Sequence, residues 1–261
     1  MKKKKFKFSH LYLGLVMAIT YLPLIMVVIF SFNDSKLTVS WKGFTLSWYQ
    51  ELFHDAALIE ALKNSLILGG VSCLVAAVIG TLGAIGMARV NYKGKGMREY
   101  LSAAPIMVPE IILGMVFMAF FSLLNLPFGM LTLVLAHSAF CIPYVYMMVK
   151  ARLVGIDKSL EEAAMDLGAS PRRIFWDITL PLIMPAVLSG CVLAFAMSFD
   201  DVVISIFVNG PKLSTLPIKV YTQLKTGVTP EINALCTVIL TVVILVELVS
   251  SLFQKKSRGS R

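Results

Sequence analysis

Four carboxylates interrupt long apolar runs of the chain, and they are the residues with the clearest chemical potential. They are Glu110, Asp200, Asp201 and Glu247. In a segment that crosses a membrane, an ionised side chain at mid-bilayer costs roughly 2.5–3.5 kcal/mol on insertion scales, so such acids are functional candidates by default. The same runs carry no Lys or Arg deep inside them. A cationic solute that passes between these segments would therefore supply the missing positive charge.

The spacing of the acids predicts how they face a pathway. Glu110 follows Pro109, so we expect a kinked helix with freed backbone carbonyls at this point. Asp200 and Asp201 lie about 100° apart around a helix, so both border one pathway only if it is wide or the helix is distorted. Aromatic walls suit an ammonium ion. The predicted pathway residues are Asp200, Asp201, Glu110, Phe199, Tyr144 and Tyr221. Carboxylates that are protonated, or that bond to polar groups between helices, are the alternative interpretation.

The apolar runs that carry these acids indicate an integral membrane protein. The chain has 261 residues, of which 57% are hydrophobic and 15% charged, and its mean hydropathy is +0.81. A soluble domain carries roughly 25% charged residues, so this chain lacks the polar surface of one. Six apolar runs are long enough to cross the hydrocarbon as helices. They cover about 11–32, 65–88, 101–124, 128–149, 182–207 and 232–253.

The basic residues predict the orientation of these spans. Eighteen of the 24 Lys and Arg residues lie on one side of the runs, including the five lysines within residues 2–7. Because cytoplasmic segments are enriched in Lys and Arg, we expect both chain ends in the cytoplasm. The net charge of +9 then reflects topology rather than a nucleic-acid partner. We expect one multi-pass domain over residues 1–261, embedded in membrane lipid. The segments 33–63 and 208–231 lie on the other side. The first is either an aromatic belt that anchors the spans or a docking surface for an extracytoplasmic partner, and the glycine and proline residues of the second indicate a structured loop.

The segment 150–181, between the fourth and fifth runs, predicts two short helices. Apolar residues at helical spacing begin after a cap at Asp157 and stop at Gly168. Ser170 followed by Pro171 is an N-terminal signal for a second helix. Such a helix pair either docks on a partner protein or is a plain connector on the membrane surface.

The same segment resembles the EAA signature of permease subunits in ABC importers. The pattern is EAA, three residues, glycine, nine residues and I-x-L-P, and every defined position is matched by Glu162, Ala163, Ala164, Gly168, Ile178, Leu180 and Pro181. In that family the element is a coupling helix that sits in a groove on the ATPase subunit. The resemblance implies that Pro181 ends the helix pair. It also implies that the coupling contact is formed by Glu161, Glu162, Ala163, Ala164, Asp166, Leu167 and Gly168.

Motifs over nearly the whole chain are similar to spermidine/putrescine permeases. They include Trp48-Tyr49, Ser198-Phe199-Asp200-Asp201 and Pro230-Glu231-Ile232. The resemblance implies an all-α membrane protein with six transmembrane helices, the type I ABC importer permease fold, and a cytoplasmic coupling loop between spans 4 and 5. It implies polyamine import across a bacterial inner membrane, with a homologous permease subunit, an ATPase dimer and an extracytoplasmic polyamine-binding protein as partners. The chain is then no enzyme and binds no cofactor or metal, because ATP and Mg²⁺ belong to the ATPase.

Two rival functions stay open at this point. A related ABC permease could serve another solute, although paired intramembrane acids favour a cation over an oxyanion. An ATP-independent cation transporter could use the same acids as a relay. Such a transporter would usually show more spans or an inverted repeat.

Overall fold

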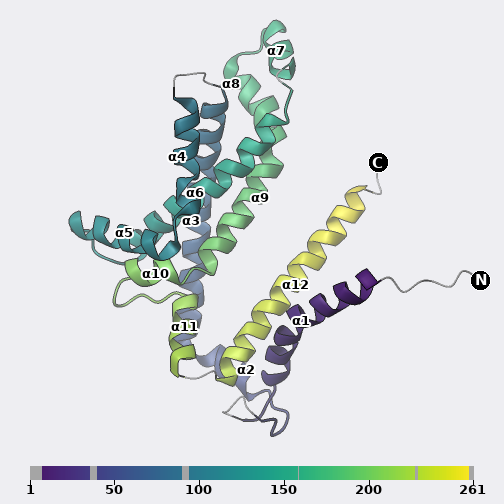
Figure 1. Ribbon diagram of the computed structural model, residues 1–261, viewed down its shortest axis with the longest axis vertical. Helices are drawn as coiled ribbons and strands as arrows, with labels where there is room; N and C mark the ends of the chain where they lie inside the picture. The colour runs from purple at the N-terminus through teal and green to yellow at the C-terminus, as the bar shows by residue number, and fades with distance from the viewer. Residues whose placement is uncertain (1–7, 36–39, 90–93, 158, 227–228, 259–261) are drawn as a thin grey trace, which may run out of the picture. The chain divides into compact units, whose positions relative to one another are not determined.

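The computed structural model describes residues 8–35, 40–89, 94–157, 159–226 and 229–258, and almost all of them are helical (Figure 1). Among these residues, one antiparallel bridge joins Asn33 and Phe44. The chain divides into two compact units, Met1–Ile59 with Val220–Arg261 and Glu60–Lys219. Several basic residues that predict the topology lie outside the described residues. These are Lys2, Lys3, Lys4, Lys5, Lys7, Lys36, Lys93, Lys158 and Arg261.

The first unit contains α1 (Phe8–Phe30), α2 (Ser47–His54) and α12 (Pro230–Arg258), and α12 packs against both of the others. Side-chain hydrogen bonds tie the start of α2 to the segment that follows α1. The indole nitrogen of Trp48 donates to the carbonyl oxygen of Asn33 over 2.8 Å, and the hydroxyls of Tyr49 and Ser31 lie 2.7 Å apart. Trp48 is buried by this arrangement, so its role includes holding the segment in place.

The second unit is built around α6 (Met130–Val154). It also contains most of α3 (Ala56–Arg89), α4 (Lys95–Met107), α5 (Glu110–Leu123) and α9 (Leu180–Phe199). Small residues allow two neighbours to approach α6 closely. A Cβ at Gly80 of α3 would lie 3.0 Å from the carbonyl oxygen of Ile142, and one at Gly190 of α9 would lie 3.2 Å from the Cα of Val145. The central position of α6 explains why its polar residues Thr132, His137 and Ser138 are buried.

Five of the described helices are long and apolar enough to cross a membrane, and a sixth span results if α4 and α5 count as one broken span. These two helices meet at an angle of 103°. The break lies at Val108 and Pro109, which are both extended. Proline lacks an N–H group and disfavours the helical conformation of the residue before it. The predicted kink at Pro109 is confirmed, and it is a complete break.

The fifth predicted span, 182–207, differs from the structure at both ends. Its helix starts at Pro171 and runs without interruption through α8 (Pro171–Ile174), the π-helical turn η1 (Phe175–Thr179) and α9. The expectation that Pro181 ends the helix pair is therefore wrong. The Leu180 N–H bonds to the carbonyl of Phe175, five residues earlier, and this wider turn accommodates the missing donor of Pro181. At the other end α9 stops at Phe199, and a separate helix α10 (Val203–Val208) follows.

Two further helices complete the described chain. Helix α7 (Ser159–Asp166) precedes α8, and α11 (Leu216–Thr226) crosses the boundary between the units. The start of α11 is attached to α3, because the Ser65 hydroxyl accepts a bond from the Leu216 N–H over 2.8 Å.

Candidate functional site

Three of the four acids gather where two helices are broken. Glu110 is the first residue of α5, directly after the break that ends α4. Asp200 and Asp201 lie in the break between α9 and α10. Helices α5 and α10 pack side by side (Figure 1), and the Glu110 carboxyl lies within electrostatic range of both aspartates. The structure thus unites acids from distant parts of the sequence in one cluster.

Asp201 is occupied by contacts within the chain. Its two carboxylate oxygens accept bonds from the backbone N–H groups of Ile204 over 3.1 Å and Ser205 over 2.8 Å. Asp201 precedes the N-cap residue Val202, and its carboxylate caps the first turn of α10 as a charged acceptor. The side chain is buried, so Asp201 has the bonded environment that the alternative interpretation of the acids describes.

His137 bridges α6 to both sides of the same break. Its Nδ1 lies 2.8 Å from the Ser198 hydroxyl, and its Nε2 lies 3.0 Å from the Ser205 hydroxyl. Nε2 is also 3.4 Å from Oδ2 of Asp201. These contacts make His137 a hydrogen-bonding bridge between helices. They satisfy both ring nitrogens and hold the Asp201 cap against α6.

Glu110 and Asp200 differ from Asp201 because both are exposed. Two aromatic residues of the predicted pathway lie near them in the second unit. Tyr144 of α6 lies within electrostatic range of Glu110, and Phe199 is the last residue of α9, stacked on Phe195 with ring centroids 5.7 Å apart. Tyr221 belongs to the first unit, where its ring lies 4.6 Å from Nζ of Lys225. The fourth acid, Glu247, is exposed on α12 of that unit.

The EAA segment forms the predicted helix–glycine–helix pair. Asp157 accepts a bond from the Ser159 N–H over 3.0 Å, and this bond holds the pKa of its carboxyl below the usual value. Gly168 has a φ of +81°, a left-handed conformation that favours glycine and ends the helix. Ser170 caps α8, with Pro171 at its first position. Helix α7 contains Glu161, Glu162, Ala163, Ala164 and Asp166, and Leu167 and Gly168 follow it directly.

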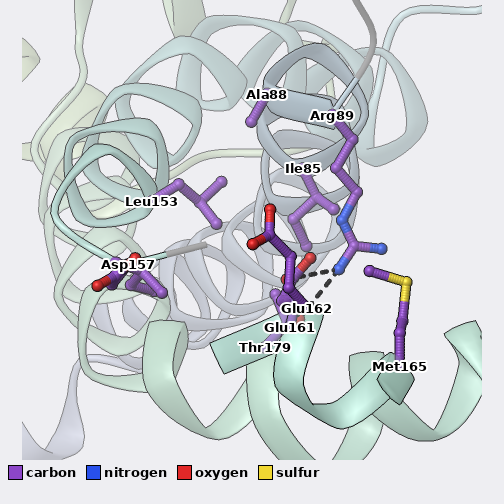
Figure 2. Close-up of a pocket in the computed structure, with 10 residues that line it drawn as sticks. Ile85, Ala88, Arg89, Leu153, Asp157, Glu161, Glu162, Met165 and Thr179 are labelled. Carbon is purple, nitrogen blue, oxygen red and sulfur yellow. Dashed lines mark hydrogen bonds and ion pairs between the residues drawn. The ribbon is translucent and has the colours of Figure 1, made fainter. Parts of the chain in front are cut away.

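A cavity of about 240 Å³ lies between α7 and the ends of α3 and α6. Three residues that line it, Arg89, Glu161 and Thr179, form a triangle of polar contacts. Figure 2 shows Arg89 at the end of α3 reaching Glu161 of α7 and Thr179 of η1. The distances from Nη2 of Arg89 are 2.8 Å to Oε1 of Glu161 and 3.0 Å to the Thr179 hydroxyl. The sequence analysis identifies Glu161 but neither Arg89 nor Thr179. In the sequence, Arg89 is one of many basic residues at the ends of apolar runs.

Comparison with known proteins places this arrangement in a family. Residues 76–257 match the family model described as binding-protein-dependent transport system inner membrane component. The putrescine transport system permease protein PotI of Escherichia coli (strain K12) is 42% identical over 248 residues, which cover 92% of this chain and 88% of that protein. The spermidine/putrescine transport system permease protein PotC of the same strain is 39% identical over 246 residues, covering 94% and 93%.

Solved structures agree in fold. A bacterial ABC transporter involved in the import of the acidic polysaccharide alginate matches with a TM-score of 0.72 at 17% identity, covering 95% of this chain and 94% of that one. The MetNI methionine ABC transporter matches with a TM-score of 0.57 at 18% identity, covering 84% and 100%. The sequence matches and the shared helical fold together show that the chain belongs to the family of inner membrane components of binding-protein-dependent transport systems.

Proposed function

We propose that this chain is a transmembrane permease subunit of an ATP-driven polyamine importer. The observation that carries the proposal is the cluster of Glu110, Asp200 and Asp201, in a chain related to permeases named for putrescine and spermidine. The neighbours of known structure support the fold but not the solute, because one of them imports an acidic polysaccharide. A cluster of carboxylates suits a polycation instead.

In the proposed pathway the two exposed acids bind solute. Putrescine and spermidine are flexible chains with protonated amines at both ends, so Glu110 and Asp200 can each bind one ammonium group. Tyr144 and Phe199 provide aromatic surface for the ammonium groups and the methylene chain. Asp201 acts indirectly, since its cap of α10 fixes the end of α9 that carries Asp200.

The tip formed by α7 and α8 is proposed to dock on the ATPase. This tip and the adjoining turn η1 expose large apolar side chains among charged residues, with 89% of Leu167, 52% of Met165 and, in η1, 64% of Trp176 accessible. Apolar surface of this kind on a loop is typical of a protein contact. The loop, both chain ends and the ATPase then lie in the cytoplasm, in agreement with the distribution of basic residues.

The proposed assembly contains this chain, a homologous permease subunit, an ATPase dimer and an extracytoplasmic polyamine-binding protein. The chain itself is non-catalytic and holds no cofactor, since ATP and Mg²⁺ bind to the ATPase. Closure of the ATPase dimer draws the coupling loops together and opens the pathway outward, and hydrolysis returns it to the inward-facing state. This is alternating access driven from the loop tip.

Uptake of labelled spermidine and putrescine into proteoliposomes that contain the assembled importer tests the proposal. We expect uptake that requires ATP, and a fall of about tenfold in Asp200→Asn and Glu110→Gln while ATP hydrolysis continues. Glu247→Gln is the matched control, because it removes an exposed acid from an apolar helix outside the cluster. ATP hydrolysis that responds to the binding protein, without polyamine uptake, would show that the proposed solute class is wrong. Uptake that ignores ATP would refute the importer itself.

A further inference from the structure

The triangle of Arg89, Glu161 and Thr179 joins three elements that are far apart in the sequence. Nη2 of Arg89 donates to both partners, and the Thr179 hydroxyl donates to Oε1 of Glu161 over 2.7 Å (Figure 2). Each donor in this ring has a hydrogen available, so the three bonds can exist together. The Thr179 side chain is buried, while the Arg89 and Glu161 side chains are 38% and 30% exposed.

Helix α7 contributes no buried side chain to the second unit. Within Ser159–Asp166, all of which the structure describes, every residue is at least partly exposed. Close backbone contacts join α7 to α8 and η1, which are its neighbours along the chain. The polar triangle is a direct side-chain link from α7 to α3, and a cavity of about 240 Å³ beside it leaves room for α7 to move.

Thr179 connects the triangle to a second candidate membrane span, α9, in addition to α3. It is the last residue of η1, and the helix continues from it through α9 to Phe199, next to Asp200. The π turn that ends at Thr179 has a hydrogen-bond pattern different from the helices on either side. Such turns are often found at functional sites, and here the turn separates the loop tip from the membrane span.

We propose that Arg89 is a positioning residue that locks α7 to α3 and α9, so that movement of α7 shifts both spans together. The inference rests on the proposed function, because it assumes that the ATPase acts on α7. Without the lock, the ATPase still binds the loop tip and hydrolyses ATP, but α7 rocks into the cavity and the spans do not follow. Loss of Arg89 therefore uncouples hydrolysis from transport.

The test measures ATP hydrolysed per polyamine transported in the assembled importer, for Arg89→Gln, Thr179→Val and a control. Coupling free energies between sites typically correspond to factors of about 5 to 150. We expect the ratio to rise about tenfold in Arg89→Gln and by a smaller factor in Thr179→Val, which keeps the ion pair. The control is Glu99→Gln. It removes an ion pair of similar exposure outside the loop tip, between Glu99 of α4 and Lys150 of α6, with an N–O distance of 3.0 Å, and should leave the ratio unchanged.

A charge exchange separates coupling from general damage. Arg89→Glu alone should uncouple more strongly than Arg89→Gln, and the combination of Arg89→Glu with Glu161→Arg should recover part of the uptake. A ratio that stays at the wild-type value in Arg89→Gln, or uptake and hydrolysis that fall together, would overturn the inference. If Arg89→Gln does not assemble, Thr179→Val decides by the same ratio. Failure of wild-type uptake would instead refute the proposed function, so the two failures are distinguishable.

Discussion

Replacement of Asp201 and of its neighbour Asp200 should have different consequences, although the residues are identical and adjacent. In Asp201→Ala, the N–H groups of Ile204 and Ser205 lose their acceptors, and both residues are fully buried. Each orphaned amide costs about 1–3 kcal/mol, so we expect a loss of about 2–6 kcal/mol. Asp200→Ala removes an exposed carboxylate, and substitutions of that kind usually change stability by no more than about 0.5 kcal/mol.

The apparent melting temperature of the purified importer in detergent measures this difference. At roughly 2–4 °C per kcal/mol, Asp201→Ala should lower it by at least about 4 °C, whereas Asp200→Ala should leave it within about 2 °C of wild type. Uptake kinetics give a second measure. We expect Asp200→Asn to raise the KM for polyamine, and Asp201→Asn chiefly to lower the maximal rate, because fewer subunits are correctly folded.

His137 provides a control for the same reasoning. His137→Ala and Asp201→Ala disturb one network, so their combined effect on melting should be smaller than the sum of the single effects. Equal destabilisation by Asp200→Ala and Asp201→Ala would refute the assignment of the cap to Asp201. A rise in KM from Asp201→Asn at unchanged melting temperature would also refute it, since Asp201 would then contact solute.

Three further predictions concern turns and caps. Gly210→Ala should lower the melting temperature by several degrees, because its Cβ would overlap the carbonyl oxygen of Phe128, and wild-type melting would contradict this. Gly168→Ala meets no neighbour but keeps a φ of +81°, so about 1–2 kcal/mol of strain should speed amide exchange in α7, with exchange in α6 as the reference. The lowered pKa of Asp157 means that its cap stabilises α7 above the unfolded-state pKa and is lost as pH falls through the lower folded-state pKa. Exchange at Ser159, corrected for intrinsic rates, should show this loss, and Asp157→Asn should abolish it.

Local patterns in the sequence are sufficient to predict the helix pair within residues 150–181. The stop at Gly168 and the cap at Ser170 with Pro171 depend on backbone conformation and on bonds within a few residues. The break before Glu110 was also predictable in position, because the effect of Pro109 is local. Its angle of 103° was not, since it depends on the packing of α5 against α10.

The end of α9 shows where such reasoning fails. The run 182–207 carries no charged residue apart from the two aspartates, so its composition predicts one span. The helix instead ends at Phe199, and a new helix, α10, begins at Val203. Asp201 caps the first turn of this new helix, and His137 of α6 holds the Asp201 carboxylate in place. A contact from another helix, far away in the sequence, thus decides where this helix ends. The passage of the helix through Pro181 was missed because a π turn accommodates it.

The sequence by itself determined that the chain is a membrane protein, which segments are apolar, and that a helix pair of the EAA type follows the fourth span. These properties depend on composition and on short-range spacing. The tertiary structure alone decided which of two adjacent aspartates is buried, and that Arg89 contacts a glutamate 72 positions away. The environment of a charge depends on every element that packs around it, and packing brings together residues whose separation along the chain carries no signal.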